Sequence, residues 1–335
     1  MMRITIRADG NAEIGFGHLF RTSAVAEELL RRGHQVTYAT TTPRNVASVT
    51  PSSVEIIELK SRDKPRSFTQ VLPDQTDVVL IDSYRAGKDY QRTIRDKVSV
   101  VLVSDDTRHP VCADVVINGN IYGTELEYEV LGNEPVWCLG ADYLLLRESI
   151  ASKAVEEPPW REQPERTIIT MGGSDPTEMT PKILEGFDGT SLRVDAIIGP
   201  GFSERQERHI RRIAETVSAD VYPIREPDDI ARRIFESDFA VCTASTTTYE
   251  MLALGTPIIS LPVVDNQQLI AAELLKRDAA TVLQPECDVA RLREAVETYI
   301  QKKDLRWNRR SLGRNLVDGK GTHRVVDCLT NRYSS

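Results

Sequence analysis

Residues 3–33 read RITIRADGNAEIGFGHLFRTSAVAEELLRRG, and this stretch decides the fold because it joins a strand, a glycine-containing loop and a helix. Residues 3–7 alternate polar and apolar side chains, which is the pattern of a β-strand. Small or apolar side chains at positions 22, 25, 26, 29 and 30 then recur at the spacing of one helical face. Gly33 stands where a helix commonly ends. The stretch therefore predicts the first β–α unit of an α/β sheet.

The same alternation of strands and helices continues along the chain. Short apolar runs predict further strands at residues 35–40, 54–59, 77–81, 98–103, 114–117, 166–171, 192–198, 239–242, 257–261 and 280–283. Helical patterns separate most of these runs, which indicates parallel sheets covered by helices. Residues 151–165 interrupt the pattern with three prolines and several charges, and we interpret them as an interdomain linker. We therefore expect two α/β domains, at residues 1–150 and 166–335, the second ending in C-terminal helices.

The composition is that of a globular protein with an excess of acidic residues. The 335 residues include 42 lysines and arginines against 50 aspartates and glutamates, so the formal net charge is −8. This balance argues against nucleic acid and anionic membranes as partners, since both require a positive face. No apolar run of about 18 residues occurs, and Arg3, Arg7 and Asp9 interrupt the first ten positions. We therefore expect a cytoplasmic protein with no signal peptide and no membrane span.

The five cysteines are scattered and form no Cys-x-x-Cys pair, which disfavours a disulfide framework or a zinc site. A basic run at residues 301–314 lies in the C-terminal helical region. We interpret it as a solvated helix face, with membrane attachment as the alternative.

The loop after the first predicted strand is the first candidate for chemistry. Gly15 and Gly17 let its backbone turn tightly, and His18 follows at the start of the helix. The positive end of the helix dipole disfavours an imidazolium, so we expect a neutral histidine that can act as a general base. A dinucleotide-binding fingerprint or a plain turn is the alternative. The fingerprint lacks its third glycine, which is replaced by Phe20, and residues 40–42 are threonines where an acidic residue is required.

Polar side chains also follow two other predicted strands of the first half. Residues 82–84 read Asp-Ser-Tyr and residues 104–106 read Ser-Asp-Asp. Each group alone is more typical of a turn or a helix cap than of a catalytic site. Both lie at carboxyl ends of strands, where His18 is also expected. The two carboxylates Asp105 and Asp106 resemble metal ligands, but no further ligand has suitable spacing, so we predict no metal.

Two loops of the second half have the composition of phosphate-binding loops. Residues 170–176 read TMGGSDP and residues 242–250 read CTASTTTYE, and each links a predicted strand to a helix. Backbone N–H groups and hydroxyls at a helix start suit phosphate oxygens, although ordinary N-capping explains the same residues. No GxxxxGK[ST] motif occurs. Glu250 could accept hydrogen bonds from ribose hydroxyls. The side-chain amides within residues 265–268 (DNQQ) could hydrogen-bond sugar hydroxyls, and a helix cap by Asp265 is the alternative interpretation.

Taken together, these motifs resemble one known family, the UDP-2,4-diacetamido-2,4,6-trideoxy-β-L-altropyranose hydrolases of pseudaminic acid biosynthesis. The resemblance extends from about residue 3 to about residue 325. The matching segments are Arg7-x-Asp9, Gly15-Phe16-Gly17-His18-x-x-Arg21, Gly140-x-x-Tyr143-x-Leu145-Leu146-Arg147, Met171-Gly172-Gly173-Ser174-Asp175-Pro176, Thr246-Thr247 with Glu250, Ala253-Leu254-Gly255-x-Pro257 and Asn266-Gln267.

The resemblance implies a GT-B fold, in which two Rossmann-like domains face a central cleft that holds the nucleotide sugar. It implies an enzyme that breaks the anomeric C–O bond with inversion, uses water as acceptor, and releases UDP and the free sugar. It implies no metal and no cofactor. The UDP-sugar is the expected partner, with contacts to other enzymes of the same pathway as a further possibility.

The resemblance also implies roles for individual residues. His18 would activate the water, with Asp9 and Tyr84 near the sugar. Uracil would lie against the backbone around Ile224 and Arg225. Ser245, Thr246 and Thr247 would bind the phosphates, Glu250 the ribose, and Asn266 and Gln267 the sugar or the diphosphate. The remaining substrate-binding positions, with no particular group assigned, would be Gly15, Gly17, Arg21, Gly172, Gly173 and Ser174.

The chain departs from the family pattern at three places. Residues 242–245 read Cys-Thr-Ala-Ser where relatives usually carry glycines, residues 225–230 lack an Asn-Met pair, and residues 148–150 differ from a proline-containing stretch. A related UDP-sugar is therefore an alternative substrate. Three other functions also remain open: a GT-B glycosyltransferase, a hydrolysing UDP-N-acetylglucosamine 2-epimerase, and a non-catalytic nucleotide-sugar-binding protein.

Overall fold

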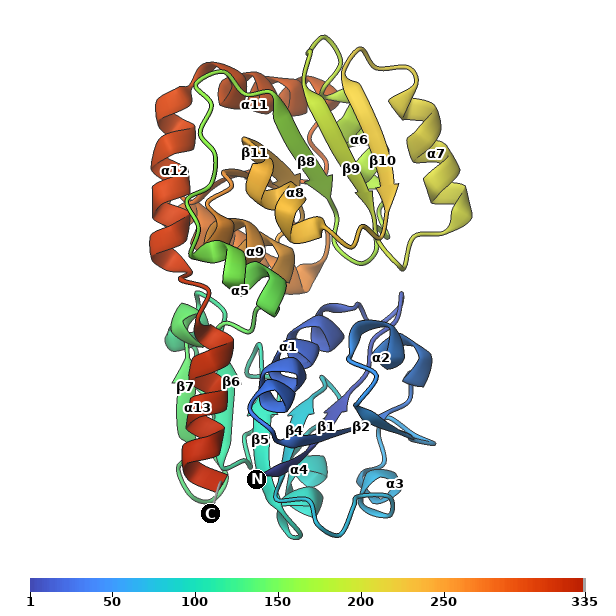
Figure 1. The fold of residues 1–335 in the computed structure, drawn as a ribbon, viewed down its shortest axis with the longest axis vertical. Helices are drawn as coiled ribbons and strands as arrows, with labels where there is room; N and C mark the ends of the chain where they lie inside the picture. Colours follow the sequence, from blue (N-terminus) through green and yellow to red (C-terminus); the bar gives the residue numbers. More distant parts are fainter. Residues whose placement is uncertain (334–335) are drawn as a thin grey trace. The chain divides into compact units, whose positions relative to one another are not determined.

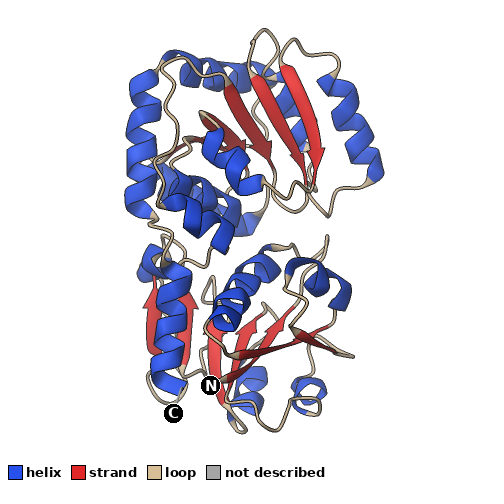
Figure 2. Ribbon diagram, viewed as in Figure 1, coloured by secondary structure: helices blue, strands red, loops and turns tan. Residues whose placement is uncertain are grey.

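The structure is a computed structural model that describes residues 1–333. The chain divides into two compact units (Figure 1). The first unit comprises residues 1–148 together with the described residues from 320 onward, and the second unit comprises residues 149–319. Each unit contains one parallel sheet with helices packed on it (Figure 2). The expected α/β class is therefore confirmed.

The sheet of the first unit has seven strands in the order β3-β2-β1-β4-β5-β6-β7, with every neighbouring pair parallel. Its strands are β1 (Arg3–Ala8), β2 (Gln35–Thr40), β3 (Glu55–Glu58), β4 (Val78–Asp82), β5 (Ser99–Val103), β6 (Val115–Asn118) and β7 (Val136–Leu139). Its helices are α1 (Gly17–Arg31), α2 (Pro43–Val49), α3 (Pro65–Thr69), α4 (Lys88–Arg95) and α13 (Gly321–Tyr333), with 3₁₀ turns η1 (Gly123–Glu125) and η2 (Ala141–Tyr143).

The sheet of the second unit has six strands in the order β10-β9-β8-β11-β12-β13, again all parallel. Its strands are β8 (Arg166–Thr170), β9 (Arg193–Ile198), β10 (Asp220–Arg225), β11 (Phe239–Cys242), β12 (Ile258–Ser260) and β13 (Ala280–Val282). Its helices are α5 (Glu148–Ala154), α6 (Met179–Glu185), α7 (Glu204–Ala214), α8 (Ile230–Glu236), α9 (Thr246–Leu254), α10 (Gln268–Lys276), α11 (Val289–Gln301) and α12 (Lys303–Leu316), with the 3₁₀ turn η3 (Asp265–Gln267).

In each sheet the strand order reverses at one point. In the first unit β1 lies between β2 and β4, and in the second unit β8 lies between β9 and β11. Chain segments that leave the carboxyl ends of such a strand pair diverge to opposite faces of the sheet, and ligands of open α/β sheets bind there. The loops after β1 and β4, and those after β8 and β11, are therefore the places to examine for a site.

All the predicted strands form, within a few residues of their expected ends. Two strands were not predicted, β7 and β10, and both lie at an edge of their sheet. β7 is only four residues long and just one of them, Cys138, is buried. β10 contains Pro223, which is tolerated because an edge strand leaves one row of backbone groups unpaired. Within residues 1–333, no helix combines the length and the apolar character needed to cross a bilayer.

The expected domain boundaries need correction at two places. The predicted linker, residues 151–165, belongs to the second unit, and its first part is helical in α5. The predicted second domain ran to residue 335, whereas α13 belongs to the first unit. The reason is packing, since Val325, Val326 and Leu329 of α13 complete the same apolar core as Ile4 and Leu19.

The basic run near the C-terminus is not a solvated face. Arg306, Arg309 and Arg310 of α12 are all buried. The Arg306 guanidinium donates to the carbonyl of Glu162 at 2.6 Å, and that of Arg310 donates to the carbonyl of Pro159 at 3.0 Å. Residues 157–165 form no helix or strand, because their prolines lack N–H donors, so their carbonyls lack regular partners. The arginines of α12 satisfy these carbonyls and hold the segment in place.

We expect Arg306→Ala to lower the free energy of unfolding by about 2–4 kcal/mol, because it removes hydrogen bonds to two carbonyls and leaves a cavity. Urea denaturation followed by circular dichroism measures this loss. Lys303→Ala is the control, since that side chain lies on the same helix and is 52% exposed. Equal stabilities of the two variants would contradict a structural role for Arg306.

Candidate active site

The loop between β1 and α1 places a histidine at the reversal point of the first sheet. Gly15 has φ +90°, a conformation that favours glycine, and its N–H donates to the carbonyl of Asn11 at 2.8 Å. This turn ends at Gly17, the first residue of α1. His18 is therefore the second residue of the helix, and its side chain is buried beside β4.

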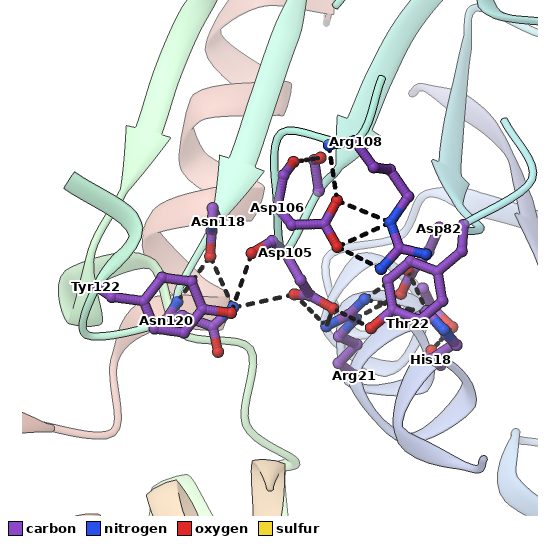
Figure 3. A network of polar contacts seen from close by, with 12 residues as sticks. His18, Arg21, Thr22, Asp82, Asp105, Asp106, Arg108, Asn118, Asn120 and Tyr122 are labelled. Atoms are coloured by element: carbon purple, nitrogen blue, oxygen red, sulfur yellow. Dashed lines mark hydrogen bonds and ion pairs between the residues drawn. The ribbon is translucent and has the colours of Figure 1, made fainter. Parts of the chain in front are cut away.

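His18 forms a short hydrogen bond to Asp82, the last residue of β4 (Figure 3). The distance from Nδ1 to Oδ1 is 2.6 Å. Burial acts to raise the pKa of Asp82, but the charge of Arg21 and the contact with His18 hold this pKa well below its ordinary range. The carboxylate is therefore ionised and can only accept, and this shortest contact of Nδ1 assigns the proton to Nδ1. Arg21 Nη2 lies 3.1 Å from the same Nδ1 and is shared between the imidazole and Asp82. The lone pair of Nε2 is left to accept a proton.

A tyrosine and a second carboxylate complete the polar network in the first unit. The Tyr84 ring meets the His18 ring edge-on, with 4.7 Å between centroids. The Tyr84 hydroxyl donates to Asp105 at 3.0 Å, and Asp105 also accepts from the Asn120 amide at 3.0 Å. The Arg108 guanidinium lies 4.1 Å from the centroid of the Tyr84 ring. The tyrosine is thus held between two charged groups and beside the histidine.

The structure brings His18, Arg21 and Tyr84 together, but it places Asp9 elsewhere. The Asp9 carboxylate pairs with Arg7 at 2.7 Å and accepts the N–H of Thr41 at 2.6 Å. Its oxygens therefore anchor the loop after β2, and a role at the sugar stays a prediction.

Sequence reasoning noted residues 82–84 and 104–106 at carboxyl ends of strands, but it did not include Asp82 or Asp105 among the predicted site residues. A usable signal was present, because β4 and β5 follow β1 in the sheet and each of the two aspartates stands at or just after the carboxyl end of its strand. Residues at these ends of neighbouring parallel strands converge on one edge.

At the reversal point of the second sheet, the two predicted phosphate loops lie side by side. Gly172 has φ +81°, and a Cβ built there would lie 3.8 Å from the Ser245 hydroxyl and 4.0 Å from the Thr247 hydroxyl. Among residues 1–333 the Ser245 hydroxyl has no hydrogen-bond partner, although it is buried. Gly199 packs so closely that a Cβ there would lie 2.4 Å from the Gly172 carbonyl. The Gly172–Gly173 loop is therefore packed tightly against residue 199.

Other predicted residues of the second unit surround these loops or lie near them. Gly173 accepts the N–H of Gly201 at 2.7 Å, and Ser174 follows it in the same loop. Thr246 begins α9, and Glu250 is buried one turn later. These residues form one group at the carboxyl edge of the sheet.

The amide of Gln267 ties two loops together. Its Oε1 accepts the Thr243 hydroxyl at 2.5 Å and the N–H of Val263 at 2.7 Å. Gln267 is therefore partly structural, while its neighbour Asn266 is exposed.

The expected uracil position lies at the free edge of the second sheet. Ile224 and Arg225 end β10, which is the outermost strand. The N–H of Glu226 donates to Ile198 of β9 at 2.9 Å. Because the peptide is trans, the Arg225 carbonyl of that same peptide points the opposite way, toward the open edge. An acceptor is thus available there for a donor on a bound base.

One group of three side chains in the described part of the chain has metal-ligand spacing, namely Glu28, Glu148 and His323. Glu28 is already engaged, because its oxygens accept from Arg31 at 2.7 Å and 2.8 Å and from Arg32 at 2.5 Å. A cation would have to displace these guanidinium groups. We therefore interpret the group as an ion-pair cluster that joins α1 to α13.

This cluster predicts a pH dependence of stability. Burial acts to raise the pKa of Glu28, but hydrogen bonds from Arg31, His323 and Arg32 lower it from 4.5 to about 2. A depressed folded-state pKa stabilises the fold above pH 4.5, and the contribution is lost as the pH falls toward 2. Glu28→Gln should flatten the stability profile in this range, measured by urea denaturation at several pH values. Glu204→Gln, at a 91% exposed side chain, should leave it unchanged.

The two Rossmann-like units, each with a parallel sheet and a reversal point, define the GT-B fold. Solved structures share it. MurG of Acinetobacter baumannii superposes with a TM-score of 0.69 at 17% identity, covering 99% of this chain and 100% of that one. The calicheamicin glycosyltransferase CalG4 gives 0.67 at 15% identity, with complete coverage of both chains. At these identities the likeness establishes the fold alone. No family model matches the chain.

Three curated proteins are similar in sequence. The uncharacterized protein MJ1062 of Methanocaldococcus jannaschii is 25% identical over 344 residues, covering 99% of this chain and 67% of its own length. The spore coat polysaccharide biosynthesis protein SpsG of Bacillus subtilis is 28% identical over 232 residues, 66% of each chain. The UDP-2,4-diacetamido-2,4,6-trideoxy-β-L-altropyranose hydrolase of Campylobacter jejuni is 25% identical over 280 residues, covering 82% of this chain and 97% of its own.

Proposed function

We propose that the protein hydrolyses a UDP-linked 2,4-diacetamido-2,4,6-trideoxy hexose at the anomeric C–O bond, releasing UDP and the free sugar with inversion. The observation that carries this proposal is the His18–Asp82 pair, a buried imidazole held in one tautomer by a 2.6 Å hydrogen bond at the reversal point of a parallel sheet. The similarity to the Campylobacter jejuni hydrolase supports the choice of substrate class.

The second unit would bind the UDP moiety. The diphosphate would lie against the N-terminus of α9, at the positive end of the helix dipole, and would be bound by the hydroxyls of Ser245, Thr246 and Thr247. Of these, the Ser245 and Thr247 hydroxyls lie beside Gly172 of the other loop. Glu250 would accept the ribose hydroxyls. The Arg225 carbonyl, on the open side of β10 next to Ile224, would accept the N–H of uracil. The unpartnered Ser245 hydroxyl supports this assignment.

The first unit would supply the catalytic base. Nε2 of His18 takes one proton from a water molecule while the water oxygen forms a bond to the anomeric carbon. The C–O bond to the diphosphate breaks, and its electron pair leaves with UDP. The resulting imidazolium is stabilised by Asp82. UDP is a good leaving group, so no metal is required by this chemistry, and helix N–H groups offset the charge that develops on it.

The remaining predicted residues take positioning roles in this scheme. Gly15 and Gly17 set the backbone that starts α1, and Gly173 and Ser174 shape the phosphate loop. Tyr84 lies beside the base and would contact the sugar. Asn266 and Gln267 would hold the sugar or the diphosphate. In this proposal the reaction takes place in the cytoplasm, and other enzymes of the same pathway would be its partners.

A glycosyltransferase is the second candidate function. The fold is shared with MurG and with the calicheamicin glycosyltransferase, so the fold supports a transfer reaction as well as it supports hydrolysis. In that case His18 would take the proton from an acceptor hydroxyl instead of from water. The epimerase and the non-catalytic binding protein named above rest on no particular contact in the structure.

Proton NMR of the full chain with UDP-2,4-diacetamido-2,4,6-trideoxy-β-L-altropyranose, in EDTA and without acceptor, tests the proposal. We expect free UDP and the free sugar, first as the opposite anomer. An unchanged spectrum would reject hydrolysis of this substrate, and an acceptor screen would then test transfer. A product altered at C2 would indicate the epimerase.

A further inference from the structure

Arg21 is enclosed by two carboxylates and has no nitrogen left for a ligand (Figure 3). Its Nε donates to Asp82 Oδ2 and its Nη2 to Asp82 Oδ1, each at 2.6 Å. Nη2 also lies 3.1 Å from Nδ1 of His18. Its Nη1 donates to the two oxygens of Asp105 at 2.7 Å and 2.9 Å. The side chain is 12% exposed. Contact between Arg21 and a substrate phosphate would therefore break a planar, bidentate ion pair.

The balance of charge around His18 depends on this arginine. Asp82 is 1% exposed and serves both His18 and Arg21 through the same oxygen, Oδ1. The attraction of Asp105 and Asp82 outweighs burial and raises the pKa of Arg21 well above its ordinary value, so the guanidinium is permanently charged. A buried carboxylate without a cation is unfavourable, so it either takes up a proton itself or favours a positive charge on its neighbour.

We propose that Arg21 is a positioning residue that keeps His18 neutral by compensating the charge of Asp82, and that it does not bind the substrate. The inference rests on the proposed function, in which His18 is the base. Without Arg21 the buried carboxylate would retain a second proton on the imidazole. An imidazolium has no lone pair and cannot accept a proton from water.

The other groups near His18 do not replace Arg21. Tyr84 meets the ring edge-on, and its hydroxyl is bonded to Asp105. Arg108 lies over Tyr84 and is paired with Asp106 at 2.9 Å. Removing Arg21 therefore leaves two carboxylates, Asp82 and Asp105, on this side of the ring. The net charge of the group favours protonation of His18.

The protonation state of His18 can be measured without substrate. Imidazole ¹⁵N chemical shifts of the histidine-labelled full chain distinguish a neutral ring with its proton on Nδ1 from an imidazolium, and a His18→Gln sample identifies the His18 signals. At pH 7 we expect the neutral Nδ1–H ring in the native protein and an imidazolium in Arg21→Met. Arg21→Met/Asp82→Asn, which removes both charges, should be neutral again. Arg31→Met, at a 59% exposed arginine of the same helix, is the matched control and should not change the His18 signals.

Kinetics of UDP release give the second readout. We expect Arg21→Met to lower kcat about 10²-fold at pH 7, with KM little changed and with activity recovering as the pH rises. Arg21→Lys, which keeps the charge, should show a smaller loss. An unaltered His18 ring in Arg21→Met, or a raised KM with native kcat, would overturn the proposal. If methionine prevents folding, Arg21→Gln takes its place under the same criteria. Absence of UDP release by the native protein would count against the proposed function alone, because the NMR result does not depend on it.

Discussion

His18→Ala is expected to lower kcat for UDP release by about 10²–10⁴-fold, the range that general-base assistance contributes. Removing the imidazole leaves the water without a proton acceptor, while the UDP loops of the second unit are untouched. KM for the UDP-sugar should therefore stay close to the native value. Release of UDP from the UDP-sugar, followed in a coupled assay over a range of substrate concentrations, separates the two parameters.

The effect should be specific to this histidine. His209→Ala provides the control, because that side chain lies on α7 of the second unit and is 43% exposed. Asp82 keeps its two hydrogen bonds from Arg21 when the imidazole is removed, so circular dichroism and the urea midpoint should report a folded variant. Near-native turnover in folded His18→Ala would show that His18 is not the base and that another residue takes the proton from water.

Gly172→Val is expected to weaken UDP binding by about 10–10²-fold. The backbone at Gly172 has φ +81°, and a β-branched residue in that region carries strain of about 1–3 kcal/mol. The loop would relieve this strain by moving, and the added side chain would occupy space within 4 Å of the Ser245 hydroxyl. Since about 1.4 kcal/mol corresponds to a tenfold change in Kd, the expected range follows from the strain. Calorimetric titration with UDP measures it directly.

Gly189→Val separates strain from binding. Gly189 also lies in the second unit, has φ +90°, and has nothing within 4 Å of a built Cβ. Valine there should lower stability to a similar degree and leave the Kd for UDP unchanged. Equal affinities of the two variants for UDP would mean that the Gly172 loop does not contact the nucleotide.

The sequence was sufficient to predict the repeating β–α units and the positions of the loops that matter. Apolar runs and helical stripes are local signals, and the loop at 15–18 combines glycines with a histidine at a helix start, so both could be recognised from spacing. Asp82 and Asp105 are different, because an aspartate at the end of a strand is most often a cap. Only the strand order, in which β4 and β5 lie next to β1, shows that both aspartates lie at the same edge of the sheet as His18.

Long-range packing could not be predicted from local pattern. The arginines of α12 look like a solvated basic run in sequence, yet Arg306 and Arg310 satisfy carbonyls about 145 and 150 residues away. In the same way, the helical pattern of residues 321–333 does not indicate which of the two sheets this helix packs against. Such pairings depend on which carbonyls and apolar surfaces remain unsatisfied after the sheets have formed.

Because α13 belongs to the first unit, the core of the first unit can be completed only after that of the second unit during synthesis. The ribosome releases residues 1–148 first, but Val325, Val326 and Leu329 complete their apolar core only when the last segment emerges. Residues 149–319 are continuous and can close their core earlier. A premature stop within the final helix would therefore leave the beginning of the protein, not its end, with an open core, and would expose it to chaperones and proteases.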